Sequence, residues 1–237
     1  MKQSLGGARL RAGLSELELL DRANDPILSH ATLATLQPQD EFAIIDVGAN
    51  VGGVSLTFSK LFPKAQVYAV EADPTTYQRM AKRCAHTPAI CPVNMAIHSQ
   101  SGTIDFHSNK SSVLSSVIDL PDGRANAKLI KINAKTLDEL VQDLQIRNVA
   151  VLKVDTEGND LEVLKGADKL LRGRSLRYVI CEFGIHPADA RHVGINLLLR
   201  FMAQRGFFVS TMGSFGCHAD YIYGNALFVQ KAIHTGE

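Results

Sequence analysis

The sequence lacks any long hydrophobic run. Its apolar stretches, of which Val149–Val154 is one, are far shorter than the roughly 20 residues that a membrane-spanning helix needs. Residues 1–20 are interrupted by charges and lack the apolar centre of a secretory signal. We therefore predict a cytoplasmic protein without a membrane span.

Cysteine is scarce, and neither sign of charge dominates. The 4 cysteines show no C-x-x-C spacing, which indicates reduced packing thiols and offers no clustered ligand set for structural zinc. The formal net charge is +1, so no overall field would draw the protein to nucleic acid or to an anionic membrane surface. We expect no nucleic-acid partner.

Short apolar segments alternate with helical stretches from residue 42 onward. Strands are predicted at 42–46, 66–71, 89–94, 149–155, 178–183, 207–212 and 226–230, with extended segments at 102–106 and 128–134. Helices are predicted at 51–61, 74–84, 136–144, 160–171 and 189–205. This alternation predicts an α/β, doubly wound fold, with a mainly parallel sheet and helices on both faces. The last two strands have no long helix between them, which predicts one antiparallel strand.

Residues 1–41 differ from the rest of the chain. Leucines at helical spacing within residues 14–20 predict one helix, and residues 27–36 predict a second, short one. We therefore expect an N-terminal helical extension over 1–41 and a main domain over 42–237. The extension would form a cap or a homo-oligomer contact. Residues 108–127 are polar and aperiodic, and a loop of this length is usually functional or disordered.

The strongest motif is IIDVGANVGGVSLTF, residues 44–58. An apolar strand ends in Asp46, and Gly48 and Gly52 follow before a helix. The glycines allow a tight turn and a close approach to a ligand, and the helix N-terminus offers unpaired N–H groups. Asn50 stands where a dinucleotide-binding loop has the glycine that makes room for a pyrophosphate. The loop therefore favours a ligand without a diphosphate, and Asp46 could face an ammonium group of that ligand.

A second acid, Glu71, ends the next strand about 20 residues after the loop, at the spacing of a ribose-binding carboxylate. Together, loop and acid indicate a nucleoside ligand. The alternative is a glycine-rich turn without a ligand and a solvated Glu71, which the matching order of strand, acid, glycines, helix and second acid makes improbable.

Three blocks resemble the FkbM family of S-adenosylmethionine-dependent methyltransferases. They are DVGANVG at 46–52, VEADP at 70–74 and LKVDTEGNDLEVLKG at 152–166. A further segment at 94–102 and TLDEL at 136–140 lie between the blocks, and the resemblance runs from about residue 42 to residue 230. Gly53 and the Asn159-Asp160 pair depart from the usual pattern of the family, but neither departure removes an expected cofactor contact.

The resemblance implies a Rossmann-like methyltransferase fold with a seven-stranded sheet, and S-adenosylmethionine as the cofactor. It also implies O-methylation of a hydroxyl on a small-molecule or glycan acceptor, such as a sugar or a natural product. Glu71 would hold the ribose, and the turn at 94–96 would lie near the adenine. The cofactor contacts implied in this way are Asp46, Gly48, Ala49, Asn50, Gly52, Glu71, Ala72, Asn94, Ala96 and Asp155.

A charged residue inside a strand marks the acceptor side. Lys153 should be buried, and a buried unpaired ammonium is costly. We predict a polar cluster at the strand ends, with four candidate catalytic residues: Lys153, Asp155, Glu157 and Glu182. Structurally, the cluster could be only an ion pair of Lys153 with Glu182 or Asp155. Functionally, one carboxylate would take the proton from the acceptor hydroxyl.

Asp155 is the first choice for this base, because its strand end should face the crevice, and Glu157 and Glu182 follow. His186 is a further candidate base, although a loop histidine is more often solvated. These carboxylates and His186 could also bind a divalent metal, but the spacing does not require one, and we predict none. Two other functions stay open: a non-catalytic S-adenosylmethionine-binding protein, and a nucleotide-dependent oxidoreductase.

Overall fold

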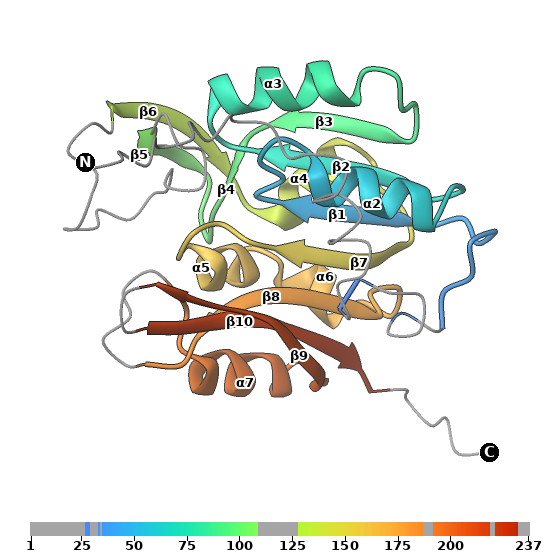
Figure 1. The fold of residues 1–237 in the computed structure, drawn as a ribbon, viewed down its shortest axis with the longest axis vertical. Helices are drawn as coiled ribbons and strands as arrows, with labels where there is room; N and C mark the ends of the chain where they lie inside the picture. Colours follow the sequence, from blue (N-terminus) through green and yellow to red (C-terminus); the bar gives the residue numbers. More distant parts are fainter. Residues whose placement is uncertain are drawn as a thin grey trace, which may run out of the picture.

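The computed structural model describes residues 27–28, 33, 35–108, 128–186, 192–218 and 221–231. A seven-stranded sheet runs through its centre, in the order β3-β2-β1-β7-β8-β10-β9 (Figure 1). The strands are β1 (Ala43–Val47), β2 (Gln66–Glu71), β3 (Ile90–Asn94), β7 (Val149–Val154), β8 (Tyr178–Gly184), β9 (Phe207–His218) and β10 (Tyr221–Gln230). All neighbouring pairs are parallel except those that β10 makes with β8 and β9, which confirms one antiparallel strand in a mainly parallel sheet.

The central strands β1 and β7 are buried along their whole length. Their sequences, AIIDV and VAVLKV, are almost continuously apolar, as expected for parallel strands that helices cover on both faces. The two polar exceptions, Asp46 and Lys153, face each other in the register of the two strands. Two charged groups therefore lie side by side in an otherwise apolar pair of central strands.

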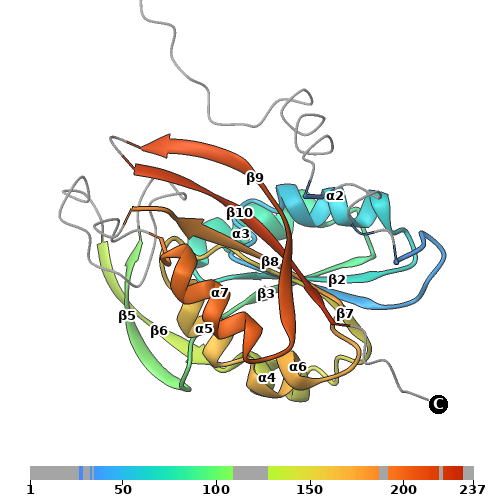
Figure 2. The ribbon, with the colours of Figure 1, turned by 90° about the horizontal axis from the view of Figure 1, so that it is seen from below.

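Helices cover both faces of the sheet (Figure 2). On one face lie α2 (Gly53–Leu61) and α3 (Pro74–Cys84), which share a core with residues such as Phe58 and Met80. On the other lie α4 (Leu137–Asp143), α5 (Asp160–Lys165), α6 (Asp168–Arg172) and α7 (Ile195–Ala203). Their apolar side chains fill a second core against the opposite face. The expected doubly wound α/β architecture is confirmed.

A small second sheet adjoins the carboxyl end of β3. It contains β4 (Ala96–Ile97), β6 (Lys128–Lys135) and β5 (Gly102–Ser108), in that spatial order. The sequence predicted β5 and β6 as extended, but it did not predict that they form a separate sheet. Both views show β5 and β6 beside one end of the large sheet (Figures 1 and 2). Because β4 follows β3 after a single residue, the small sheet lies near the edge where the carboxyl ends of the parallel strands meet.

Of the helix predicted at 27–36, the structure describes residues 27, 28, 33, 35 and 36, and none of these is helical. Ile27, Leu28, Leu33 and Thr35 lie in turns or bends. The three apolar residues are buried in the core beside α2 and α3. The helix predicted within 14–20 lies outside the described residues, and the domain boundary after residue 41 stays a prediction.

Two further helix predictions need correction. The helix predicted at 160–171 is divided into α5 and α6, because the chain comes very close to another segment at Gly166: a Cβ there would lie 2.3 Å from the His98 carbonyl oxygen. The helix predicted from 189 starts only at Ile195, and residues 187–191 lie outside the described residues, as do 109–127. Among the described residues, no helix is both long and apolar enough to cross a membrane.

Candidate functional site

The glycine loop after β1 requires its glycines for steric reasons. Gly48 and Gly52 have φ angles of 78° and 79°, a region that side chains with a Cβ rarely adopt. A Cβ on Gly48 would lie 1.8 Å from the carbonyl oxygen of Asp155. Gly52 is the N-cap of α2, and a Cβ there would lie 2.8 Å from Cys84 Sγ. The loop is therefore pressed against the end of β7 on one side and against α3 on the other.

Glu71 lies against this loop at the end of β2. Its Oε2 accepts a hydrogen bond of 2.9 Å from the backbone N–H of Asn50, and its Oε1 accepts one of 2.8 Å from the N–H of Asp73. Burial raises the pKa of Glu71 to about 7, although the two backbone N–H groups oppose the shift. Asn50 itself has a φ of 51°, so the loop strains a non-glycine residue to make this contact.

The segment after β2 is held by side chains that bind the backbone. Asp73 is the N-cap of α3 and accepts hydrogen bonds from the N–H groups of Thr75 and Thr76. Asn94 Nδ2 donates to the carbonyl oxygens of Glu71 and Ala72, at 2.8 and 3.2 Å. Asn94 thus joins the ends of β2 and β3, where the sequence predicted the adenine side of the cofactor.

Lys153 forms the centre of a buried ion-pair group. Its Nζ lies 3.3 Å from Asp46 Oδ1 and 3.1 Å from Asp155 Oδ2. Ser55 Oγ donates a hydrogen bond of 2.6 Å to the other oxygen of Asp46. Burial lowers the pKa of Lys153, but the carboxylates of Asp155 and Asp46 outweigh this effect and raise it above its usual range, so the side chain carries its charge.

The ion-pair partner predicted for Lys153 was Asp155 or Glu182, and the structure shows Asp155 together with Asp46. Asp46 has an exposed fraction of 0%, and its oxygens face Lys153 and Ser55. Its expected contact with the cofactor ammonium stays a prediction, and the geometry adds a structural role. The Asp155 side chain is 35% exposed, which leaves it open to a ligand.

Carboxyl groups crowd the ends of β7 and β8. Burial raises the pKa of Glu182 far above its ordinary range, and the charges of Asp155, Asp160 and Glu157 add to the shift. Burial and the charge of Asp155 likewise raise the pKa of Asp160 to about 6. Backbone N–H groups, among them those of Thr156 and Gly158, donate hydrogen bonds to the Asp160 carboxylate and oppose this shift. The four candidate catalytic residues therefore lie at one edge of the sheet, together with Asp160, which the sequence argument passed over.

Sequence reasoning also missed His192 and Tyr223. His192 Nε2 lies 3.5 Å from Glu182 Oε2, and its ring stacks on that of Tyr223, with centroids 4.8 Å apart and an interplanar angle of 8°. No local motif surrounds His192, so only the contact with Glu182 could have revealed it. His186, the histidine that the sequence did suggest, is exposed and lies beside Tyr221, with ring centroids 5.2 Å apart.

The residues around the glycine loop fit S-adenosylmethionine. Glu71 places a carboxylate at the loop for a ribose, and the absence of a Cβ on Gly48 lets the loop pack directly on the Asp155 backbone. Asn50 Oδ1 is buried without a hydrogen-bond partner in the described part of the chain. Such an atom is costly unless a ligand or water satisfies it, which favours a polar ligand at this loop.

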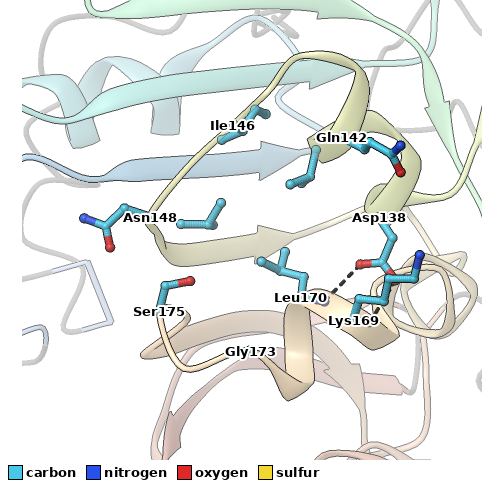
Figure 3. A pocket seen from close by; sticks show the side chains of 10 residues that line it. Asp138, Gln142, Ile146, Asn148, Lys169, Leu170, Gly173 and Ser175 are labelled. Atoms are coloured by element: carbon cyan, nitrogen blue, oxygen red, sulfur yellow. Dashed lines mark hydrogen bonds between the residues drawn. The ribbon is translucent and has the colours of Figure 1, made fainter.

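A separate pocket lies at the opposite end of β7 (Figure 3). It is lined by residues of α4, of α6 and of the segment before β7, including Asp138, Asn148 and Lys169. Asp138 accepts hydrogen bonds from the N–H groups of Lys169 and Leu170, so it stabilises the start of α6. Val149, the first residue of β7, also lines this pocket, whereas Asp155 follows the last residue of the strand, so the pocket is separate from the charged edge.

Comparison with known proteins identifies relatives of this chain. Residues 46–209 match the family described as the Methyltransferase FkbM domain. The hexuronic acid methyltransferase AglP of Haloferax volcanii is 31% identical over 156 residues, which cover 65% of this chain and 61% of AglP. The 2-O-methyltransferase NoeI of Sinorhizobium fredii is 23% identical over 167 residues, which cover 65% of this chain and 68% of NoeI. The match with AglP thus spans less than two thirds of AglP's own length.

Solved structures show the same fold. A methyltransferase FkbM from Methylobacillus flagellatus has a TM-score of 0.52 at 14% identity, covering 82% of this chain and 46% of the other. The magnesium protoporphyrin IX methyltransferase of Synechocystis, solved with bound S-adenosylmethionine, has a TM-score of 0.52 at 12% identity, covering 95% and 87%. The fold is therefore that of a Rossmann-like methyltransferase. With the family match over residues 46–209, this chain belongs to the FkbM family of S-adenosylmethionine-dependent methyltransferases.

Proposed function

We propose that this methyltransferase transfers the methyl group to a hydroxyl oxygen of a sugar, a glycan or a natural product. The observation that carries the proposal is the contact between the cofactor loop and the acidic edge, where Gly48 packs on the backbone of the partly exposed Asp155. Carboxylates suit a hydroxyl acceptor because they accept its hydrogen bonds. AglP and NoeI, by their names a hexuronic acid methyltransferase and a 2-O-methyltransferase, support the same chemistry.

The cofactor side of this proposal rests on the glycine loop and Glu71. Gly48, Ala49, Asn50 and Gly52 would line S-adenosylmethionine, and Glu71 would accept hydrogen bonds from its ribose hydroxyls. Ala72, Asn94 and Ala96 would border the adenine. When bound, the cofactor supplies an electrophilic methyl group on a positively charged sulfur.

The acceptor side rests on Asp155. Its side chain is exposed enough to accept a hydrogen bond from the acceptor hydroxyl and so to aim the hydroxyl oxygen at the methyl group. Lys153 contacts Oδ2 of Asp155 and would hold the carboxylate in place. Glu157 would contact a neighbouring hydroxyl of the same acceptor.

The test is a methyl-transfer assay with S-adenosylmethionine labelled in the methyl group. The acceptor panel contains neutral sugars, hexuronic acids and natural-product polyols. We expect label on an oxygen of at least one acceptor and a loss of about 10²–10⁴-fold in Asp155→Ala. Asp105→Ala is the matched control, because Asp105 is exposed on β5 and pairs with Lys131.

Calorimetric titration separates the alternatives. Binding of S-adenosylmethionine by the wild type, and its loss in an Asp46→Ala, Glu71→Ala double variant, would support the proposed cofactor site. Retained binding without transfer to any hydroxyl would contradict O-methylation and favour the non-catalytic binding protein. Binding of NADH instead of S-adenosylmethionine would favour an oxidoreductase.

A further inference from the structure

The pair Glu182–His192 lies at the same edge as Asp155 and has no part in the function proposed so far. The His192 side chain is 6% exposed and that of Glu182 is 11% exposed. Two titratable groups are therefore largely buried, with 3.5 Å between Nε2 and Oε2. This separation is longer than a hydrogen bond, but such contacts in ligand-free sites often tighten when substrate binds.

Neighbouring strands fix the orientation of the His192 ring. Tyr223 on β10, on whose ring it stacks, pairs with Gly184 of β8 and with Gly216 of β9. A Cβ on Gly216 would lie 2.3 Å from Tyr223 Cζ, so only glycine leaves room for the tyrosine ring in this position. The Gly184 N–H donates to the Val193 carbonyl oxygen at 2.9 Å, which ties the residue after His192 to β8.

The pair adjoins the acceptor cluster. Lys153 pairs in register with Ile180 of β8, and Glu182 lies two residues beyond Ile180, so alternation places its side chain on the same face as that of Lys153. The charges of Asp155 and Glu157 act on both Glu182 and Tyr223. His192 is therefore held within the acidic cluster that we propose binds the acceptor.

We propose that His192 takes the proton from the acceptor hydroxyl, with Glu182 and Tyr223 as positioning residues. The inference rests on the proposed O-methylation, and it replaces Asp155 as the base while leaving Asp155 to bind the hydroxyl. The hydroxyl oxygen forms the new bond to the methyl carbon, and the carbon–sulfur bond breaks with its electron pair left on sulfur. The hydroxyl proton moves to a ring nitrogen of His192 and from there to water.

Charge balance favours this assignment. Methyl transfer converts a positively charged sulfonium into a neutral thioether, and proton transfer converts neutral His192 into a cation. Lys153 keeps its charge throughout, so the acidic cluster faces the same number of positive charges before and after the reaction, which avoids leaving its carboxylates uncompensated. His192 contacts Glu182 and Tyr223, and the charged or titratable groups that act on one or both of these are Asp155, Glu157, Asp160, Lys153 and Cys217. Asp155, by contrast, already shares its charge with Lys153.

The experiment is the pH profile of kcat/KM for the wild type and for His192→Gln, with S-adenosylmethionine titrated into each protein. We expect a loss of about 10²–10⁴-fold in kcat/KM and loss of the acidic limb of the profile, while cofactor affinity changes less than about twofold. His86→Gln is the matched control, because His86 is exposed in the turn after α3. If His192→Gln fails to bind the cofactor, His192→Asn, which keeps a polar group nearer the backbone, takes its place in the same measurement.

The positioning role of Glu182 has its own test. Glu182→Leu should lower kcat at least about tenfold with little change in KM, and Glu182→Gln, which keeps a hydrogen-bonding partner for His192, should restore part of it. An unaltered acidic limb and rate in both His192 variants would overturn the inference while O-methylation stands. A wild-type protein that binds the cofactor but methylates no hydroxyl would overturn both.

Discussion

The proposed cofactor side and the proposed acceptor side of the sheet edge are built from different kinds of contact. On the cofactor side, backbone N–H groups a few residues away bind the carboxylates: Glu71 binds the N–H of Asp73, and Asp73 binds those of Thr75 and Thr76. On the acceptor side, charged side chains bind one another: Lys153 contacts Asp155, two residues away, and Asp46, 107 residues away. Contacts such as those of Asp73 can be predicted from a short sequence motif. The contact between Lys153 and Asp46 forms only when two distant strands come together in the folded chain.

This difference predicts at which positions of the sheet edge a substitution lowers the stability of the fold most. A carboxylate that is bound by backbone N–H groups keeps its partners as long as the local turn forms. A buried ion-pair group instead loses the compensation of several charges when one member is removed.

Replacing Lys153 with methionine should destabilise the fold most. The Lys153 side chain is 7% exposed and compensates both Asp46 and Asp155, so its removal leaves a buried carboxylate without a counter-charge. We expect a loss of about 3–5 kcal/mol in the free energy of unfolding, measured by urea denaturation at pH 7. Adding Asp46→Asn to this variant should recover part of the loss. Lys131→Met, which removes one member of an exposed ion pair, is the control and should change the free energy of unfolding little. An equal loss in this control would show that burial of the Lys153 ion pairs is not the cause.

Gly48→Ala tests the contact that joins the two sides. Gly48 has a φ of 78°, and the added Cβ would overlap the Asp155 carbonyl oxygen. We therefore expect the free energy of unfolding to fall by about 3 kcal/mol and the affinity for S-adenosylmethionine to decrease strongly. Gly206→Ala is the matched control, because Gly206 has a φ of 80° and open space around its Cβ position. Gly206→Ala should lower the free energy of unfolding by about 1 kcal/mol and leave the affinity for the cofactor unchanged. Equal costs at both positions would mean that backbone strain alone explains Gly48.

The pKa of Glu71 predicts how cofactor affinity depends on pH. A pKa of about 7 leaves roughly a tenth of Glu71 ionised at pH 6 and nine tenths at pH 8. If the ionised form holds the ribose hydroxyls, affinity for S-adenosylhomocysteine should rise about tenfold across this range. Calorimetry at several pH values measures it. Glu71→Gln should bind S-adenosylhomocysteine more weakly than the wild type at pH 8, and its affinity should no longer depend on pH. If the affinity of Glu71→Gln changed with pH as in the wild type, another group would be responsible for the pH dependence.

The same group has the opposite effect on stability. The raised pKa means that folded Glu71 keeps its proton between about pH 4.5 and 7, where the unfolded chain has released it. The contribution of Glu71 to the free energy of unfolding is therefore present below about pH 4.5 and decreases as pH rises to about 7.

The smallest effect is expected away from the edge, at the start of α4. Thr136 and Glu139 form a capping box, in which the Thr136 side chain accepts a hydrogen bond from the Glu139 N–H at 3.1 Å. Thr136→Ala should cost about 1 kcal/mol and leave cofactor affinity and kcat/KM unchanged. Thr136→Ser, which keeps the hydroxyl, should restore stability. A changed cofactor affinity in Thr136→Ala would show that α4 is coupled to the site.

Local patterns predicted the elements that carry the cofactor side. The strand, glycines and helix of residues 44–58 appear as β1, the loop and α2, and Glu71 ends β2 as its spacing predicted. The capping box of α4 was also readable, because both partners lie within four residues. In each case the decisive contact is close in sequence, so residue type and spacing are sufficient.

Contacts between distant segments were not readable in this way. Nothing near Lys153 points to Asp46, which is 107 residues away, and nothing near His192 points to Glu182 or Tyr223. Gly166 lies in a sequence that predicts a continuous helix, and only its approach to the His98 carbonyl explains the break between α5 and α6. Tertiary packing overrides local propensity at these positions.

If the glycine loop binds the cofactor and Asp155 binds the acceptor, as we propose, the close approach of Gly48 to Asp155 makes the affinities of the two substrates interdependent. The Asp155 N–H donates to the Val47 carbonyl oxygen at 3.0 Å, so the loop and the acceptor carboxylate share a rigid connection through both neighbours. A shift of the loop on cofactor binding would be transmitted to Asp155 without an intervening flexible element. Because thermodynamic coupling is reciprocal, an acceptor that tightens cofactor binding must itself bind more tightly, by the same factor, once the cofactor is in place.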